Sequence, residues 1–126
     1  KLAAKKLVLR TQFPVLLLYA TYLSLASQPG VVFASYSDKF LHVLCWCVLL
    51  LSLRLAMAPK FYRYRSALGL FLYAAGVEYL QNLSPERYFS WLDMLANGVG
   101  IVLGIILWGL YWRLLQRFSA RKIPSE

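Results

Sequence analysis

Four long runs of apolar residues, separated by short polar breaks, dominate the sequence. The runs cover about residues 7–26, 38–58, 66–83 and 90–115. Each is close to the roughly 20 residues that an α-helix needs to cross about 30 Å of hydrocarbon. The alternation of apolar and polar residues that is typical of membrane barrel strands is absent. The pattern therefore predicts an all-α fold, a bundle of four transmembrane helices in a single domain of residues 1–126.

The breaks between the runs contain residues that end or begin helices. Pro29 and Gly30 interrupt the chain after the first run, and Pro59 follows the second. In the last break, Ser90 and Asp93 have the spacing of a capping box, in which a side-chain oxygen accepts a hydrogen bond from a free amide of the first turn. The fourth helix should therefore begin directly after Ser90.

Charge predicts the direction in which the helices cross. The chain has 14 Lys and Arg against 5 Asp and Glu, a net charge of +9. The basic residues gather in three places, which contain Lys1, Lys5, Lys6 and Arg10; Arg54, Lys60, Arg63 and Arg65; and Arg113, Arg117, Arg121 and Lys122. The other two breaks hold only Lys39 and Arg87. Because basic loops stay in the cytoplasm, both termini are predicted to be cytoplasmic. No polar face remains for a basic groove, so nucleic-acid binding is not expected.

The first run also resembles a secretory signal peptide. A basic start precedes an apolar stretch, and Ser24 and Ala26 have the spacing of a cleavage site. We expect it to be an uncleaved first span. Cys45 and Cys47 lie two residues apart in the second run, so on a helix they point to different sides and should not form a disulfide.

Polar residues interrupt the apolar runs next to the two breaks predicted on the non-cytoplasmic side. They are Asp38, Lys39 and His42 at the start of the second run, Glu78 and Gln81 at the end of the third, Arg87 in the following break, and Asp93 and Asn97 at the start of the fourth. Within each helix the spacing of three or four residues puts them on one face. They should fall in one slab, about 10 Å deep by helix rise. The sequence therefore predicts a polar cluster with contributions from three helices.

On the fourth run, the helix face that carries Asp93 and Asn97 continues inward with Gly100 and Gly104. A pair of glycines four residues apart allows two membrane helices to approach closely, so we expect both to pack against a neighbouring helix. Asp93 and Asn97 would then face the bundle and not the lipid. Ionisable groups within the hydrocarbon of a bilayer are costly without partners, so Lys39 or Arg87 could neutralise Asp93 or Glu78, and His42 could bond either carboxylate.

Several kinds of chemistry fit these residues. Glu78 or His42 could act as a general base, although no nucleophile elbow or phosphate-binding glycine loop accompanies them. The carboxylates with His42, and with Cys45, could bind a divalent metal, yet no strong ligand spacing such as His-Glu-x-x-His occurs. We therefore predict no metal and no other cofactor. The remaining interpretations are a binding site for a polar head group and ion pairs that only fasten helices.

The order of these residues resembles that of the VanZ-like family of small bacterial membrane proteins. The family shares an Asp-Lys-x-x-His element, a Glu-x-x-Gln element, an Arg, and an Asp-x-x-x-Asn-x-x-Gly run. In this sequence they fall on Asp38, Lys39 and His42; on Glu78 and Gln81; on Arg87; and on Asp93, Asn97 and Gly100. The resemblance covers residues 37–104. It implies that the polar cluster is the signature of the family, without assigning it a ligand. The founding member is associated with low-level resistance to the glycopeptide antibiotic teicoplanin.

The leading hypothesis is a multi-pass protein of the bacterial cytoplasmic membrane with a polar cluster that faces outward. This cluster would bind the polar head group of a membrane lipid or of a lipid-linked envelope precursor, in connection with envelope modification or teicoplanin resistance. One alternative is an intramembrane enzyme that uses Glu78 or His42 as acid or base on an envelope lipid. Another is a structural membrane subunit. Oligomerisation remains open under each.

Overall fold

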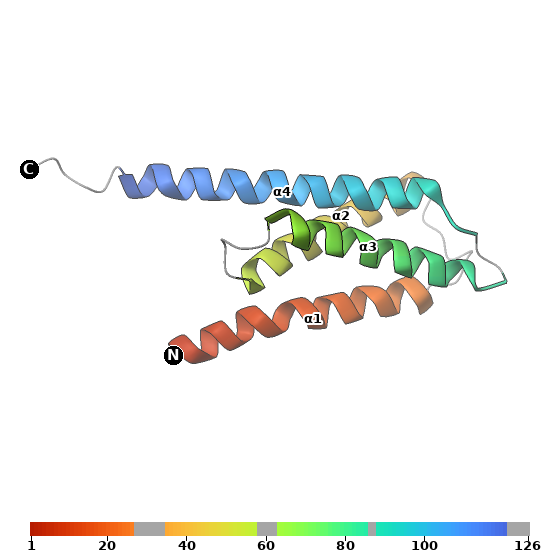
Figure 1. Ribbon diagram of the computed structural model, residues 1–126, viewed down its shortest axis with the longest axis horizontal. Coiled ribbons are helices and arrows are strands. Elements are labelled where there is room, and N and C mark those ends of the chain that lie inside the picture. The colour runs from red at the N-terminus through yellow and green to blue at the C-terminus, as the bar shows by residue number, and fades with distance from the viewer. Residues whose placement is uncertain (27–34, 58–62, 86–87, 121–126) are drawn as a thin grey trace, which may run out of the picture.

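The computed structural model of the protein describes residues 1–26, 35–57, 63–85 and 88–120. They form four helices: α1 (Leu2–Ala26), α2 (Ser35–Ala56), α3 (Arg63–Asn82) and α4 (Trp91–Ala120) (Figure 1). No strand occurs within these ranges. The predicted all-α fold, with one helix for each apolar run, is therefore confirmed.

Two helices continue past the predicted ends of their apolar runs. α1 begins at Leu2 and not near residue 7, and α4 continues to Ala120 and not only to about residue 115. The added turns are rich in Lys, Arg, Leu and Ala, which all favour helix, and they contain no Pro or Gly. Hydropathy predicts only the part of a helix that lies in hydrocarbon. The helical backbone continues beyond it until a helix-breaking residue such as Pro or Gly occurs.

Two of the four helices are long and apolar enough to cross a membrane by composition alone. Within the described residues these are Asp38–Ala56 of α2 and Trp91–Ala120 of α4. The prediction of four transmembrane helices is thus met in part by composition, since α2 and α4 qualify and α1 and α3 do not. The reason is their polar content: Arg10, Thr11 and Gln12 are consecutive in α1, and α3 contains both Glu78 and Gln81.

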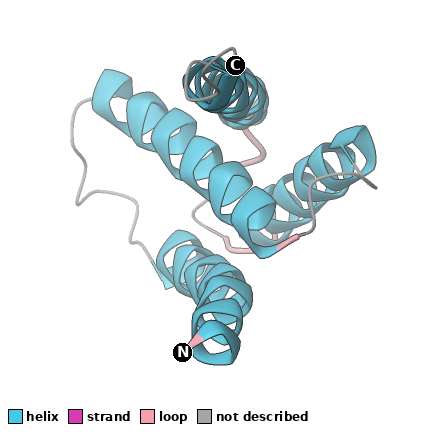
Figure 2. Cartoon of the chain, turned by 90° about the vertical axis from the view of Figure 1, so that its left-hand side faces the viewer, coloured by secondary structure: helices cyan, strands magenta, loops and turns pink. Residues whose placement is uncertain are grey.

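The bundle is centred on α2. Its most extensive interface is with α4, and it also packs on α1, while α3 lies mainly against α4 and α1. Viewed along the bundle, α2 crosses diagonally between α1, marked by the N-terminus, and α4, marked by the C-terminus (Figure 2). The buried apolar core contains Trp46, Leu49 and Leu50 of α2, Ala67, Leu70 and Ala74 of α3, and Ile101 of α4.

Two glycines of α4 set its close approach to α2. A Cβ atom built on Gly100 would lie 2.3 Å from the backbone oxygen of Val43, which is a steric overlap. One built on Gly104 would lie 2.7 Å from Cδ2 of Leu50 and 3.2 Å from the backbone oxygen of Cys47. The contact at Gly100 involves backbone on the α2 side, which cannot move aside as a flexible side chain can. The two helices therefore meet at a separation that only glycine permits.

Polar contacts attach α1 to the rest of the bundle. None of its residues is buried. Gln12 forms two hydrogen bonds with Ser52 of α2: Nε2 donates to the Ser52 backbone oxygen (2.8 Å), and Ser52 Oγ donates to Gln12 Oε1 (2.6 Å). Further along, Thr21 Oγ1 and Tyr73 Oη of α3 lie 2.7 Å apart. Partly buried apolar residues of α1 also pack against the core, so side-chain hydrogen bonds and apolar contacts together position this helix.

The Gln12–Ser52 pair gives a first prediction. Ser52→Ala is expected to lower the free energy of unfolding by about 1 kcal/mol, because Gln12 Oε1 loses its donor in a partly buried position. Adding Gln12→Leu should recover much of this loss, since the pair becomes apolar on both sides. Thr11→Ala is a suitable control, because the Thr11 hydroxyl bonds only to backbone oxygens of α1. Unfolding in detergent measures all four proteins. An equal loss in Ser52→Ala and Thr11→Ala would contradict the prediction.

Candidate functional site

A polar cluster joins the first turns of α2 and α4. We use the name α2–α4 cluster for its five residues, Asp38, Lys39, His42, Asp93 and Asn97. The Lys39 ammonium forms an ion pair with Oδ1 of Asp93 and lies 3.4 Å from Oδ2 of Asp38. The Asp93 side chain is 15% exposed and that of Asp38 is 47% exposed, so the cluster extends from the helix interface to the surface. Lys39 thus links the two helices through opposite charge.

His42 of α2 lies beside this ion pair and reaches residues of both helices. Its Nδ1–H donates to Oδ1 of Asn97 (2.8 Å), and its Nε2 lies 3.9 Å from Oδ1 of Asp38 and 3.9 Å from Oδ1 of Asp93. Asn97 is only 2% exposed. Since an amide oxygen can only accept, this contact fixes the proton on Nδ1. The second ring nitrogen is left facing the two carboxylates.

Glu78 of α3 binds the start of α4. It is 3% exposed, and its Oε1 accepts a hydrogen bond from the backbone N–H of Ser90 (3.0 Å). Ser90 Oγ accepts from the backbone N–H of Asp93 (3.2 Å), as the capping-box spacing predicts. In a complete capping box the acidic side chain at the third helical position would bind the N–H of the cap residue. Glu78 replaces Asp93 in that contact, which leaves the Asp93 carboxylate available for Lys39 and His42.

The remaining predicted site residues lie elsewhere. Gln81 faces α1, where its Nε2 donates to the backbone oxygen of Ser24 (2.7 Å), and it makes no hydrogen bond with the α2–α4 cluster. Of Glu78 and Gln81, only Glu78 points toward α4, because residues three apart on a helix differ in direction by about 60°. The cluster predicted from three helices is therefore corrected: α2 and α4 form it, and Glu78 of α3 lies next to it at Ser90. Arg87 lies outside the described residues.

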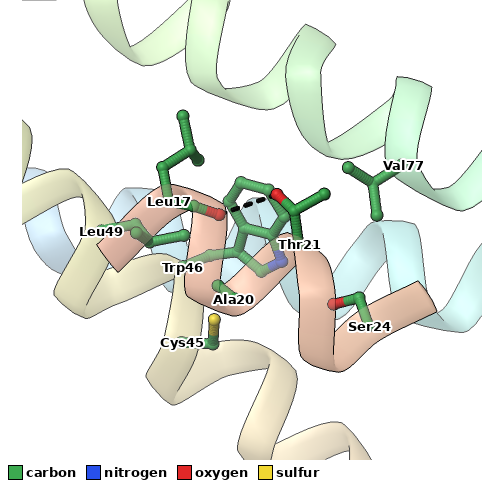
Figure 3. A pocket seen from close by; sticks show the side chains of 8 residues that line it. All are labelled: Leu17, Ala20, Thr21, Ser24, Cys45, Trp46, Leu49 and Val77. Carbon is green, nitrogen blue, oxygen red and sulfur yellow. Dashed lines mark hydrogen bonds between the residues drawn. The ribbon is translucent and has the colours of Figure 1, made fainter. Parts of the chain in front are cut away.

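Cys45 lies at a small cavity between α1, α2 and α3. The ring of Trp46 lies among side chains of α1 at this cavity, which Thr21, Ser24 and Val77 also line (Figure 3). Its volume of about 10 Å³ holds about one water molecule, so it has no room for a head group. Both cysteines are free thiols, in agreement with their spacing. Cys45 is therefore separate from the α2–α4 cluster.

Two side-chain contacts that hold the segment before α4 were not predicted from the sequence. Besides the Glu78 contact with Ser90, Oδ1 of Asn82 accepts a hydrogen bond from the backbone N–H of Phe89 (3.0 Å). Asn82 stands at the last helical position of α3, where a short polar side chain commonly binds nearby backbone. A polar residue at the predicted end of the third helix was therefore the sequence feature that could have indicated this contact. These two contacts determine where α4 begins relative to α3.

The electrostatics of the cluster favour cations and hydrogen-bond donors. Around the single ammonium of Lys39 are the carboxylates of Asp38 and Asp93, with Glu78 close by on α3. Lys39 already contacts both of its partners, and His42 directs an acceptor toward them. The described part of the site therefore has surplus acceptors and net negative charge. A hydroxyl, an amine or a metal cation fits this surplus better than an anion does.

Comparison with known proteins identifies the family. The VanZ/LLP1 family model matches residues 5–113, which include α2, α3, most of α1 and α4, and every predicted site residue. No curated protein and no solved structure gives a significant match to the chain. The matched region is most of the chain and coincides with the bundle and its cluster. The protein belongs to the VanZ/LLP1 family.

Proposed function

We propose that the protein crosses the bacterial cytoplasmic membrane four times, with both termini in the cytoplasm and the α2–α4 cluster on the other side. Beyond the two strongly apolar helices, α1 has 25 residues and α3 has 20, enough for about 37 and 30 Å at 1.5 Å per residue. Their polar side chains are partly paired within the bundle, as Gln12 is with Ser52. The basic residues at both ends and near Arg65 support this direction.

We further propose that the α2–α4 cluster binds the polar head group of a membrane lipid or of a lipid-linked envelope precursor. The observation that carries the proposal is the meeting of Asp38, His42 and Asp93 at one end of the closest helix pair, with Asp38 half exposed. Ion pairs that only fasten helices would not require an imidazole nitrogen facing two carboxylates. The surplus of acceptors indicates a head group rich in hydroxyl or amine donors.

The geometry gives the two alternatives unequal support. In the enzyme hypothesis Glu78 would exchange protons, yet its Oε1 holds the start of α4 and its side chain is nearly inaccessible. His42 is the better acid–base candidate, because Asn97 orients its ring. The structural-subunit hypothesis rests on the Lys39–Asp93 ion pair, which joins α2 and α4. The experiment below separates it from head-group binding.

Native mass spectrometry of the purified protein tests head-group binding. Asp38→Asn removes a charge from the half-exposed edge of the cluster and leaves the Lys39–Asp93 pair in place. We expect it to reduce the amount of bound lipid several-fold with little change in melting temperature. Arg117→Gln, an exposed position near the end of α4, is the control and should retain the lipids. Wild-type lipid content in Asp38→Asn and in His42→Gln, with a lowered melting temperature, would support the structural subunit instead.

The same variants can test the proposed link between head-group binding and teicoplanin resistance. A bacterial host that expresses the wild-type chain should tolerate more teicoplanin than one that expresses Asp38→Asn, at equal protein level in the membrane. Equal tolerance combined with reduced lipid binding would separate the antibiotic phenotype from the head-group site.

A further inference from the structure

Three side chains in the α2–α4 cluster have the composition of a metal-ligand set. Asp38, His42 and Asp93 each offer one ligand atom, and these atoms all lie within 4.8 Å of one another. Two carboxylate oxygens with one imidazole nitrogen suit first-row divalent ions such as Zn²⁺. We propose that these three residues form a divalent-cation site, and that the ammonium of Lys39 occupies the position of the cation when no metal is bound.

The state of His42 supports ligation. Because Nδ1–H donates to Asn97 Oδ1, a neutral ring has its lone pair on Nε2, the nitrogen that faces Asp38 and Asp93. At 3.9 Å from each carboxylate oxygen, Nε2 is too far for an N–H···O hydrogen bond. The ring therefore places no hydrogen atom between itself and the two carboxylates, and the hydrogens that these carboxylates receive come from the ammonium of Lys39. Metal-bound histidines are commonly oriented in this way, by a hydrogen bond from the other ring nitrogen to an oxygen of the protein.

The distances allow a metal to bind with small movements. Bonds of about 2.0–2.2 Å in a tetrahedral site put neighbouring ligand atoms about 3.3 Å apart. His42 Nε2 and either carboxylate oxygen need to approach by only about half an ångström from their 3.9 Å separation. Ligand atoms as far apart as the 4.8 Å limit of the set need to approach by about 1.5 Å. Rotation of the aspartate side chains supplies these movements, while the contact between Gly100 and Val43 holds the two helices in place. Exposure of Asp38 leaves the fourth position open to water or to a ligand.

Lys39 is the internal competitor of the metal. Its ammonium is paired with Asp93 and lies 3.4 Å from Asp38, so it neutralises the two carboxylates that the metal would use. Its side chain is 32% exposed and long, so it can swing outward when a metal enters. When the metal ion binds, it therefore replaces the ammonium of Lys39 as the positive charge next to the two carboxylates. Removing the Lys39 charge should strengthen metal binding.

This inference goes beyond head-group binding and departs from the absence of metal expected from the sequence. That expectation followed from the lack of a local ligand motif. The ligands here come from one turn of α2 and from α4, about 50 residues later. Only the packing of α4 on α2 brings them together, so no spacing within one helix could reveal the set.

Zn²⁺ binding by the full chain in detergent, measured by competition with a chromophoric chelator, tests the site. We expect one Zn²⁺ per chain in the wild type and at least tenfold tighter binding in Lys39→Met. At least tenfold weaker binding is expected in His42→Gln and in Asp93→Asn. Asn97→Asp should tighten binding, because a carboxylate partner makes the ring a stronger ligand. The double variant Cys45→Ala, Cys47→Ala is the control for thiol coordination and should bind as the wild type does.

Two results would overturn the proposal. One is unchanged Zn²⁺ affinity in His42→Gln, which replaces the only histidine of the chain. The other is the absence of tighter binding in Lys39→Met, with a melting curve that shows a folded protein. If Asp93→Asn fails to fold, these two variants still decide the question. The titration contains no lipid, and lipid binding can be measured with a chelator present, so failure of the metal site and failure of head-group binding are distinguishable.

Discussion

Gly100→Ala is expected to lower the free energy of unfolding by about 3 kcal/mol, the upper range for an overpacked interior. The added Cβ would lie 2.3 Å from the backbone oxygen of Val43 and 3.1 Å from Cβ of Trp46. Neither atom is at the end of a flexible side chain, so relief requires α2 and α4 to move apart. Since His42 and Asp93 approach each other across this same interface, the variant should also weaken every property that depends on the α2–α4 cluster.

Gly109→Ala is the matched control for that substitution. Gly109 is in the same helix, and nothing lies within 4 Å of the position that its Cβ would occupy. Alanine is the better helix former, so this variant should gain about 0.5–1 kcal/mol. Unfolding in detergent, followed by circular dichroism, compares the two variants. A similar stability change in both would show that the contact between Gly100 and Val43 does not limit the helix separation.

Glu78→Ala is expected to lower the free energy of unfolding by about 2 kcal/mol. The Ser90 N–H would lose its acceptor at the first turn of α4, and a buried side chain would be truncated. Glu78→Gln retains an oxygen at the same place and should lose less than half as much. If Glu78 served only as a proton acceptor for a substrate, both variants would lose function while stability remained unchanged.

The same two variants also report on the start of α4. Hydrogen exchange at Asp93 and Met94 should become faster in Glu78→Ala, because the first turn loses part of its cap. Glu78→Gln should retain the wild-type exchange rate. Equally fast exchange in both variants would contradict a capping role of the acceptor oxygen, since both lack the charge and only Glu78→Gln retains the acceptor for the Ser90 N–H.

Local sequence signals were sufficient for the helices and for the start of α4. Apolar runs predicted one helix each, and the spacing of Ser90 and Asp93 predicted the N-cap that the structure contains. The signals failed where the chain leaves hydrocarbon, since the basic turns at the start of α1 and at the end of α4 remain helical. They also overstated the apolar character of α1 and α3, whose polar side chains bind other helices.

The arrangement of the site depends on how the helices pack against one another, which spacing within a single helix does not predict. Helical spacing placed Asp38 with His42 and Asp93 with Asn97, but it could not show that α2 and α4 bring these pairs into contact. It also could not show that Gln81 reaches the backbone of Ser24 in α1. Which of two neighbouring polar residues faces a given helix depends on rotation about the helix axis. Tertiary packing sets that rotation.

The length of α4 has a consequence for the depth of the cluster. In the proposed arrangement Asp93 and Arg113 mark the two ends of the apolar part of this helix, about 20 residues or 30 Å apart, with Trp108, Tyr111 and Trp112 packed together beside Arg113. That distance equals the hydrocarbon thickness of a typical bilayer. A thicker bilayer would draw Asp93 below the interface, and a thinner one would tilt the helix. Binding at the cluster should therefore vary with the acyl-chain length of the surrounding lipid.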